Sequence, residues 1–170
     1  SQVESDEPQL TINRRFEVFF PEKRPFFLEN PSYFETPLNL YFTRRIADPE
    51  FGIRLTGKRG PWAVGALLTD DEAPGKAVPA SDPLYGQRAS VGIVRVSRDV
   101  FRQSSIGAIF ADRELNGGYN RVGGVDGRFK LNGNWLASGQ MVASATVLPD
   151  GTRMAGPAYK ARLRRDGRQF

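Results

Sequence analysis

The segment between Phe16 and Asn30 concentrates the residue types best suited to ligand binding. It interleaves phenylalanines with acidic and basic side chains, and Arg44 and Arg45 follow it closely. Aromatic rings can stack on sugar faces while charged groups supply polar contacts. The candidate ligand-binding residues are Phe19, Phe20, Glu22, Lys23, Arg24, Phe26, Phe27, Glu29, Arg44 and Arg45.

A structural role explains the same segment with fewer assumptions. Charged groups inside a protein need partners whatever the function, because an unpaired buried charge is costly. We therefore favour an interpretation in which the segment fills an interior and pairs its own charges. On this interpretation Arg44 and Arg45 form salt bridges with Glu22 or Glu29.

The composition excludes several kinds of chemistry. The 170 residues contain no Cys and no His, which removes disulfides, thiolate zinc sites, cysteine nucleophiles and Ser-His-Asp catalysis. Catalysis is left to carboxylate, Lys, Tyr or Ser/Thr chemistry, and no spacing selects a pair among the 19 acidic residues for glycoside hydrolysis. We predict no cofactor.

No motif predicts a metal or nucleotide site. Asp70, Asp71 and Glu72 form the one tight acidic cluster, but they lack the spacing of an EF-hand loop, so we predict a solvated loop and no metal site. The glycine pairs at 117–118 and 123–124 match neither a P-loop nor a dinucleotide fingerprint. They are more typical of a loop tip and of close contact between strands.

The charge balance does not predict nucleic-acid binding. The chain has 24 Lys and Arg against 19 Asp and Glu, a net charge of +5. A basic protein can bind polyanions or anionic membranes. Here the basic residues are scattered in short pairs rather than gathered in one tract, so we expect no nucleic-acid partner.

Period-two alternation dominates the chain after Phe51. Apolar residues alternate with small or polar ones at 51–56, 125–131, 135–145 and 159–164. Alternation places one class of side chain on each face of a pleated strand. Strands are predicted at 51–58, 62–69, 88–97, 105–113, 120–131, 135–146 and 152–165, with another beginning at 168.

Turn residues between these runs predict hairpin connections. Asn132-Gly133-Asn134 is a strong signal for a tight hairpin, and Lys58 to Pro61 separates the first two strands. A long loop is predicted from 69 to 87. The predicted fold is all-β, an antiparallel up-and-down meander of about eight strands over 49–170. An irregular aromatic-rich part at 1–48 precedes it, with a short helix from about Thr11 to Phe20.

Alternation leaves two environments open. A soluble sheet turns its apolar face inward, whereas an outer-membrane barrel turns it toward lipid and lines the lumen with polar groups. The uncharged stretch 131–149 is long enough for a membrane helix, but its turn residues and alternating polarity favour a hairpin. The later predicted strands have 9 to 14 residues, a length that suits a tilted membrane span.

Several strings resemble one protein family. They are Arg15-Phe16-Glu17-Val18-Phe19-Phe20-Pro21-Glu22-Lys23-Arg24-Pro25-Phe26-Phe27-Leu28-Glu29-Asn30, Tyr41-Phe42-Thr43-Arg44-Arg45-Ile46, Arg54-Leu55-Thr56-Gly57-Lys58, Gly60-Pro61-Trp62, Tyr119-Asn120-Arg121-Val122 and Gly124-Val125-Asp126. Together they resemble an uncharacterised family of Gram-negative outer-membrane proteins. In that family a carbohydrate-binding module similar to family 9 precedes a large β-barrel, and members are often labelled membrane-associated hydrolases.

The resemblance implies a fragment of a transmembrane β-barrel in the bacterial outer membrane, cut from a longer protein. Its expected partners are outer-membrane lipid and a glycan or anionic solute, and its expected role is binding or transport linked to carbohydrate handling. The alternatives are a carbohydrate-active hydrolase with a carboxylate pair and a soluble β-domain scaffold. The side chains expected to face a basic lumen are Arg54, Lys58, Asp126, Arg128, Lys130, Lys160, Arg162 and Arg164.

Overall fold

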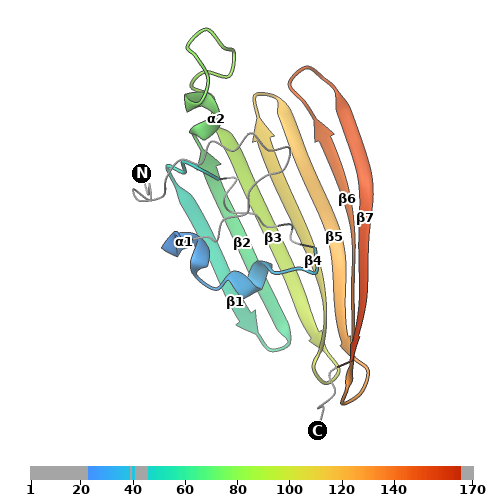
Figure 1. The fold of residues 1–170 in the computed structure, drawn as a ribbon. Helices are drawn as coiled ribbons and strands as arrows, with labels where there is room; N and C mark the ends of the chain where they lie inside the picture. Colours follow the sequence, from blue (N-terminus) through green and yellow to red (C-terminus); the bar gives the residue numbers. More distant parts are fainter. Residues whose placement is uncertain (1–22, 39, 41–45, 166–170) are drawn as a thin grey trace.

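The fold is one curved antiparallel sheet of seven strands. A computed structural model describes residues 23–38, 40 and 46–165. The strands are β1 (Gly52–Arg59), β2 (Trp62–Asp71), β3 (Ala89–Val100), β4 (Ser104–Leu115), β5 (Gly118–Lys130), β6 (Trp135–Val147) and β7 (Arg153–Arg165). They pair in chain order, so the predicted up-and-down meander is confirmed (Figure 1). The sheet is open, with β1 and β7 at its edges.

Short elements accompany the sheet. They are the single-turn helix α1 (Pro25–Leu28), the 3₁₀ turn η1 (Pro31–Phe34) and the helix α2 (Ala73–Lys76). Frequent prolines explain why α1 and η1 stop after one turn, since proline lacks the N–H that a continuing helix needs. The predicted helix at Thr11–Phe20 and the strand from 168 lie outside the described residues. In the part of the chain that is described, no helix is long and apolar enough to cross a membrane.

Local chemistry sets the hairpin ends. Gly60 adopts a φ of 57° between β1 and β2, a conformation that glycine tolerates without strain. Between β5 and β6 the Asn132 side chain accepts hydrogen bonds from the backbone N–H groups of Asn134 (2.9 Å) and Trp135 (3.0 Å). The predicted hairpin at 132–134 is therefore confirmed.

The register divides the side chains between two faces of the sheet. We call the face that carries α1 and η1 the covered face, and the other the apolar face. Arg54, Leu67, Ile93, Ala111 and Val122 form one continuous row of cross-strand neighbours on the covered face. Every second residue from this row belongs to the same face. Leu55, Ala66 and Val94 form the adjacent row, which belongs to the apolar face.

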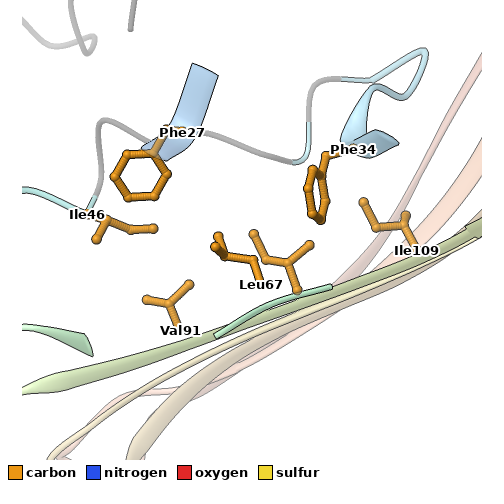
Figure 2. Close-up of a cluster of buried hydrophobic side chains, with 7 residues drawn as sticks. Phe27, Phe34, Ile46, Leu67, Val91 and Ile109 are labelled. Carbon is orange, nitrogen blue, oxygen red and sulfur yellow. The ribbon is translucent and has the colours of Figure 1, made fainter. Parts of the chain in front are cut away.

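A small hydrophobic core lies between the covered face and the described chain before β1, residues 23–38 and 46, which we call the N-terminal segment or simply the segment. Phe27 and Phe34 are 2% and 1% exposed. Figure 2 shows their rings pointing toward the sheet, where the buried partners are Leu67, Val91, Ile93 and Ile109, with Ile46 alongside. Gly65 provides the room for Phe34, because a Cβ there would lie 3.1 Å from the ring. The segment is therefore fixed to β2–β4 by aromatic packing.

The loop after β2 differs from the prediction. We expected a solvated loop from Thr69, with Asp70, Asp71 and Glu72 exposed at its start. Instead β2 continues to Asp71, and Asp70 and Asp71 are only 5% and 1% exposed. The prediction was wrong because these carboxylates accept backbone hydrogen bonds from the chain that leads into β1, a pairing that local polarity does not reveal.

Replacing Phe34 with alanine should destabilise the protein by about 3–5 kcal/mol, since it removes a buried ring and leaves a cavity. The matched control is Phe101→Ala, because Phe101 is 91% exposed in the β3–β4 turn. That substitution should change the free energy of unfolding by no more than about 0.5 kcal/mol. Denaturant unfolding of both variants measures the difference. Equal losses would show that Phe34 does not anchor the segment.

Candidate functional site

All residues expected to face a lumen lie on the covered face. The register aligns three rows across β5, β6 and β7. Asp126 lies level with Gln140 and Lys160, Arg128 with Ser138 and Arg162, and Lys130 with Leu136 and Arg164. Arg54 and Lys58 belong to the same face at β1. Period-two alternation therefore sorted these side chains onto one surface of the sheet.

A groove of about 610 Å³ opens on this face beside the N-terminal segment. We call it the basic groove. One wall is formed by Ser32, Glu35, Thr36 and Pro37, which belong to or follow η1. The rest is lined by side chains of β3–β7, and its charged members are Arg95, Asp99, Asp126, Arg128, Lys160, Arg162 and Arg164. The groove thus contains most of the cations predicted on β5 and β7.

A buried ion pair forms part of the groove lining. Arg95 Nη1 lies 2.5 Å from Asp126 Oδ2, and Arg95 Nη2 lies 2.8 Å from Asp126 Oδ1. The two side chains are 9% and 10% exposed. Parallel hydrogen bonds of this kind fix both groups in orientation. Gly107 lies between β3 and β5 and leaves the space they occupy, since a Cβ there would be 3.0 Å from Arg95 Nη2.

The wall of the groove is tied to the far strands by two hydrogen bonds. Lys160 Nζ donates to the carbonyl oxygen of Pro37 at 2.6 Å. The backbone N–H of Leu38 donates to Gln140 Oε1 at 2.5 Å, and Gln140 is 2% exposed. The segment therefore crosses the covered face from β1 and β2 to β6 and β7.

Three of the predicted ligand-binding residues, Arg24, Phe26 and Phe27, make packing contacts within the protein. Arg24 is buried, donates to the carbonyl oxygen of Ile46 at 2.5 Å, and holds its guanidinium 4.3 Å from the Phe27 ring centre. The Phe26 and Phe27 rings meet edge to face at 5.1 Å. A buried Phe27 offers no open face to a sugar. Lys23 and Glu29 are exposed.

The remaining candidates of that group are Phe19, Phe20, Glu22, Arg44 and Arg45. They lie outside the described residues, and so do the salt bridges predicted between these arginines and Glu22 or Glu29. Arg54 faces the segment, donating to the carbonyl oxygen of Phe26 at 2.7 Å and lying 5.1 Å from the Phe34 ring centre. Its contacts are therefore with the segment that covers the face.

Sequence reasoning missed Arg95 and Gln140. Arg95 lies between Val94 and Val96, and a single charged residue in an apolar run could have marked it as a candidate. The same alternation that identified Arg128 would have placed Arg95 on the covered face. Gln140 also lies between small and apolar residues, but this pattern gives no indication of its partner. Its role depends on Leu38, which is 102 residues away.

The acidic cluster at the end of β2 holds the chain before β1. Asp71 Oδ1 accepts from the backbone N–H of Asp48 at 2.9 Å, and Asp70 Oδ1 accepts from those of Glu50 (2.9 Å) and Phe51 (3.0 Å). No acidic group among the described residues has the geometry of a metal site. The cluster's contacts are structural.

Two cations, Arg88 and Lys76, pair with the acidic side chains beside the end of β2. Arg88 Nη2 lies 2.6 Å from Glu72, and Lys76 Nζ lies 2.6 Å from Asp48 and from Glu72. Hydrogen bonds to Asp48 and Glu72 raise the pKa of Lys76 above its usual value. Lys76 is therefore a permanent cation at physiological pH.

The two carboxylates that the strands contribute to the groove are each held by a cation. Asp126 is paired with Arg95, and Asp99 lies 2.6 Å from Lys58 Nζ. A glycosidase needs one protonated acid and one free carboxylate facing each other. Pairing both Asp99 and Asp126 with cations favours a binding surface over acid–base catalysis.

The apolar face carries exposed hydrophobic side chains along every strand. Leu55, Val125, Met141 and Tyr159 are 64%, 58%, 68% and 83% exposed. Its two ends are polar. At one end Arg98 lies 5.2 Å from the Trp62 ring centre, and at the other Arg121 binds Glu114 at 2.6 Å. The face therefore has an uncharged middle between two charged margins.

Neither the sequence, compared with protein-family models and curated proteins, nor the fold, compared with solved structures, has a match. The chemistry of the two faces is therefore the basis for inferring a function.

Replacing Asp126 with asparagine should cost about 3–5 kcal/mol, because it leaves the buried Arg95 without its counter-charge. Asp99→Asn is the matched control. It removes an ion pair whose side chains are 52% and 56% exposed, and pairs of that kind are worth about 0–1 kcal/mol. Denaturant unfolding measures both. Equal, small losses would mean that Arg95 and Asp126 do not depend on each other.

Proposed function

We propose that this chain forms part of the wall of a bacterial outer-membrane β-barrel, with the apolar face against lipid and the covered face toward the lumen. The observation that carries the proposal is the distribution of polarity. A soluble sheet packs its apolar face on a core and leaves the polar face in water. Here the segment covers the face that carries the charged rows and packs on its small apolar core, while the large apolar side chains of the other face are exposed.

The size of the apolar face supports a membrane environment. Seven strands have six intervals of ~4.8 Å, so the face is about 29 Å wide. Ala155 and Leu163 of β7 are eight positions apart, or about 27 Å at ~3.4 Å per residue. The apolar side chains therefore extend across all seven strands, and soluble monomers rarely expose a contiguous apolar patch of more than a few hundred Å².

The charged margins have the spacing of a bilayer. Arg153 and Arg165 mark the two ends of the apolar face on β7, twelve positions apart. At ~3.4 Å per residue and a tilt of ~40° they would be about 31 Å apart along the membrane normal. The hydrocarbon core of a bilayer is about 30 Å thick.

Aromatic residues accompany these margins. Trp62 and Trp135 belong to the apolar face near the end formed by the β1–β2 and β5–β6 turns. Tyr119 lies at the opposite end, 4.2 Å from the Arg121 guanidinium. Aromatic girdles of this kind mark both interfaces of outer-membrane barrels, where the ring is apolar and its edge is wet.

The proposed lumen contains the N-terminal segment as a partial plug and the basic groove beside it. Its role would be binding or transport of a glycan or anionic solute, in keeping with the family resemblance. A closed bacterial barrel has an even number of strands, at least eight, so β1 and β7 require further strands as partners. The exposed apolar face weighs against a soluble scaffold, and the paired carboxylates weigh against a hydrolase.

Tryptophan fluorescence tests the orientation of the sheet. The chain has two tryptophans. Once any tryptophan of the full-length protein outside these 170 residues is replaced by phenylalanine, Trp135→Phe and Trp62→Phe isolate Trp62 and Trp135 in turn. Each variant of the full-length protein is reconstituted in vesicles with lipids brominated either near the headgroup or deep in the acyl chain. We expect headgroup-proximal bromine to quench both tryptophans more strongly than deep bromine, because both lie at one margin of the apolar face.

Aqueous acrylamide serves as the opposing quencher. Strong quenching by acrylamide with no effect of either brominated lipid would contradict the barrel. The apolar face would then be a surface that contacts another protein or another part of this one.

A charge at the middle of the apolar face should oppose insertion. Val125→Arg should cost about 2–4 kcal/mol of membrane stability, against about 0–1 kcal/mol at an interface. The control is Ser90→Arg, because Ser90 lies at the margin between Asp70 and Glu114 on neighbouring strands. The fraction of protein whose electrophoretic migration is faster unboiled than boiled measures barrel assembly. Equal assembly of both variants would contradict the proposed lipid-facing surface.

A further inference from the structure

We propose that the basic groove binds a small oxyanion with at least two charged groups, held between Arg128 of β5 and Arg162 of β7. This inference rests on the proposed function, since it names the kind of solute that the proposed lumen would take. The groove is defined by the structure alone, however, and its test is independent of the membrane.

Arg128 and Arg162 lie on either side of Ser138 in one cross-strand row. The strands β5 and β7 are two intervals apart, so the two backbones are about 10 Å from each other. The short Ser138 side chain between them leaves space above the sheet. Within the described part of the chain, neither guanidinium has a hydrogen bond or an ion pair. Two arginines in this arrangement can bind separate oxyanion groups of one ligand.

The carboxylates of the groove do not neutralise these arginines. Five cations and three carboxylates line the groove, which leaves a net charge of +2. Asp126 is already engaged by Arg95, and Asp99 by Lys58, which is not part of the lining. The third carboxylate, Glu35, is exposed on the opposite wall. Arg128 and Arg162 are therefore the groove cations that retain their charge for a ligand.

The cations of β7 also repel one another. Lys160, Arg162 and Arg164 occupy alternate positions on the same face, about 6.8 Å apart along the strand. Like charges at this distance on a partly enclosed surface are mutually unfavourable. A multivalent anion would offset this repulsion, whereas a neutral sugar would not.

The dimensions limit the ligand to a small molecule. A volume of about 610 Å³ lies within the range of about 300–1,000 Å³ that is typical of small-molecule sites. The hydroxyl groups of Ser32, Ser105 and Ser138 line the same groove and can donate to oxyanions. Carboxylate and phosphate groups both present oxygen atoms that arginines and hydroxyl groups can bind. The lining of the groove suits either group.

Binding is measured with the full-length protein in detergent, by calorimetry at low and high salt. The probes are citrate for carboxylates, tripolyphosphate for phosphates and maltohexaose as a neutral glycan. We expect at least one of the two anions to bind and the neutral glycan not to bind. Affinity should fall as salt rises, because the attraction is between charges. Binding of citrate alone or of tripolyphosphate alone would identify the group recognised.

Arg128→Gln and Arg162→Gln should each weaken anion binding about tenfold, in keeping with the loss of one charge-assisted contact worth about 1.4 kcal/mol. The matched control is Arg153→Gln, since Arg153 lies on the same strand as Arg162 but belongs to the apolar face. Should either groove variant fail to fold, phenylglyoxal labelling of the wild-type protein gives the same information. The bound anion should then protect Arg128 and Arg162 but not Arg153.

Three results would overturn the site. They are failure of both anions to bind, binding of maltohexaose in preference to them, and equal effects of Arg162→Gln and Arg153→Gln. Each is separable from failure of the barrel. If brominated lipid quenches the tryptophans but no anion binds, the anion site is wrong and the barrel stands. If an anion binds but brominated lipid does not quench the tryptophans, the barrel is wrong and the anion site stands.

Discussion

The hydrogen-bonded register of the seven strands is the constraint on which the rest of the structure depends. Side chains alternate between faces with a period of two, so a slip of one residue in any pair would move a whole strand's apolar set to the other surface. The observed register keeps Arg54, Arg95, Asp126 and Lys160 on one face and Leu55, Val94, Val125 and Tyr159 on the other. Both the groove and the apolar face are consequences of that separation.

The covered face makes both apolar and polar contacts with the segment. Toward β1–β4 it is joined to the segment by the aromatic core around Phe27 and Phe34. Toward β5–β7 it is polar, with the Arg95–Asp126 pair and the hydrogen bonds from Lys160 and Gln140. Apolar packing fixes the position of the segment, and the polar contacts set how far it extends across the sheet. The groove is the part of the face that it leaves open.

The two faces support different kinds of partner. An uncharged surface with polar margins suits a bilayer, because no charge has to leave water at its centre. A groove with excess positive charge suits an anion, because its cations attract a ligand of opposite charge. The proposals for lipid on one side and a multivalent oxyanion on the other therefore follow from one arrangement of strands.

The amino-acid sequence by itself determined the strands and their faces. Alternation is a local property, so the seven described strands fall within a few residues of their predicted ranges, and the predicted lumen-facing side chains share one face. Only the tertiary structure decided which groups meet. The contact of Pro37 with Lys160 joins residues 123 positions apart, and burial of Asp70 and Asp71 depends on the chain before β1. Such pairings arise from the packing of irregular chain on a curved sheet, and no repeating pattern in the sequence encodes them.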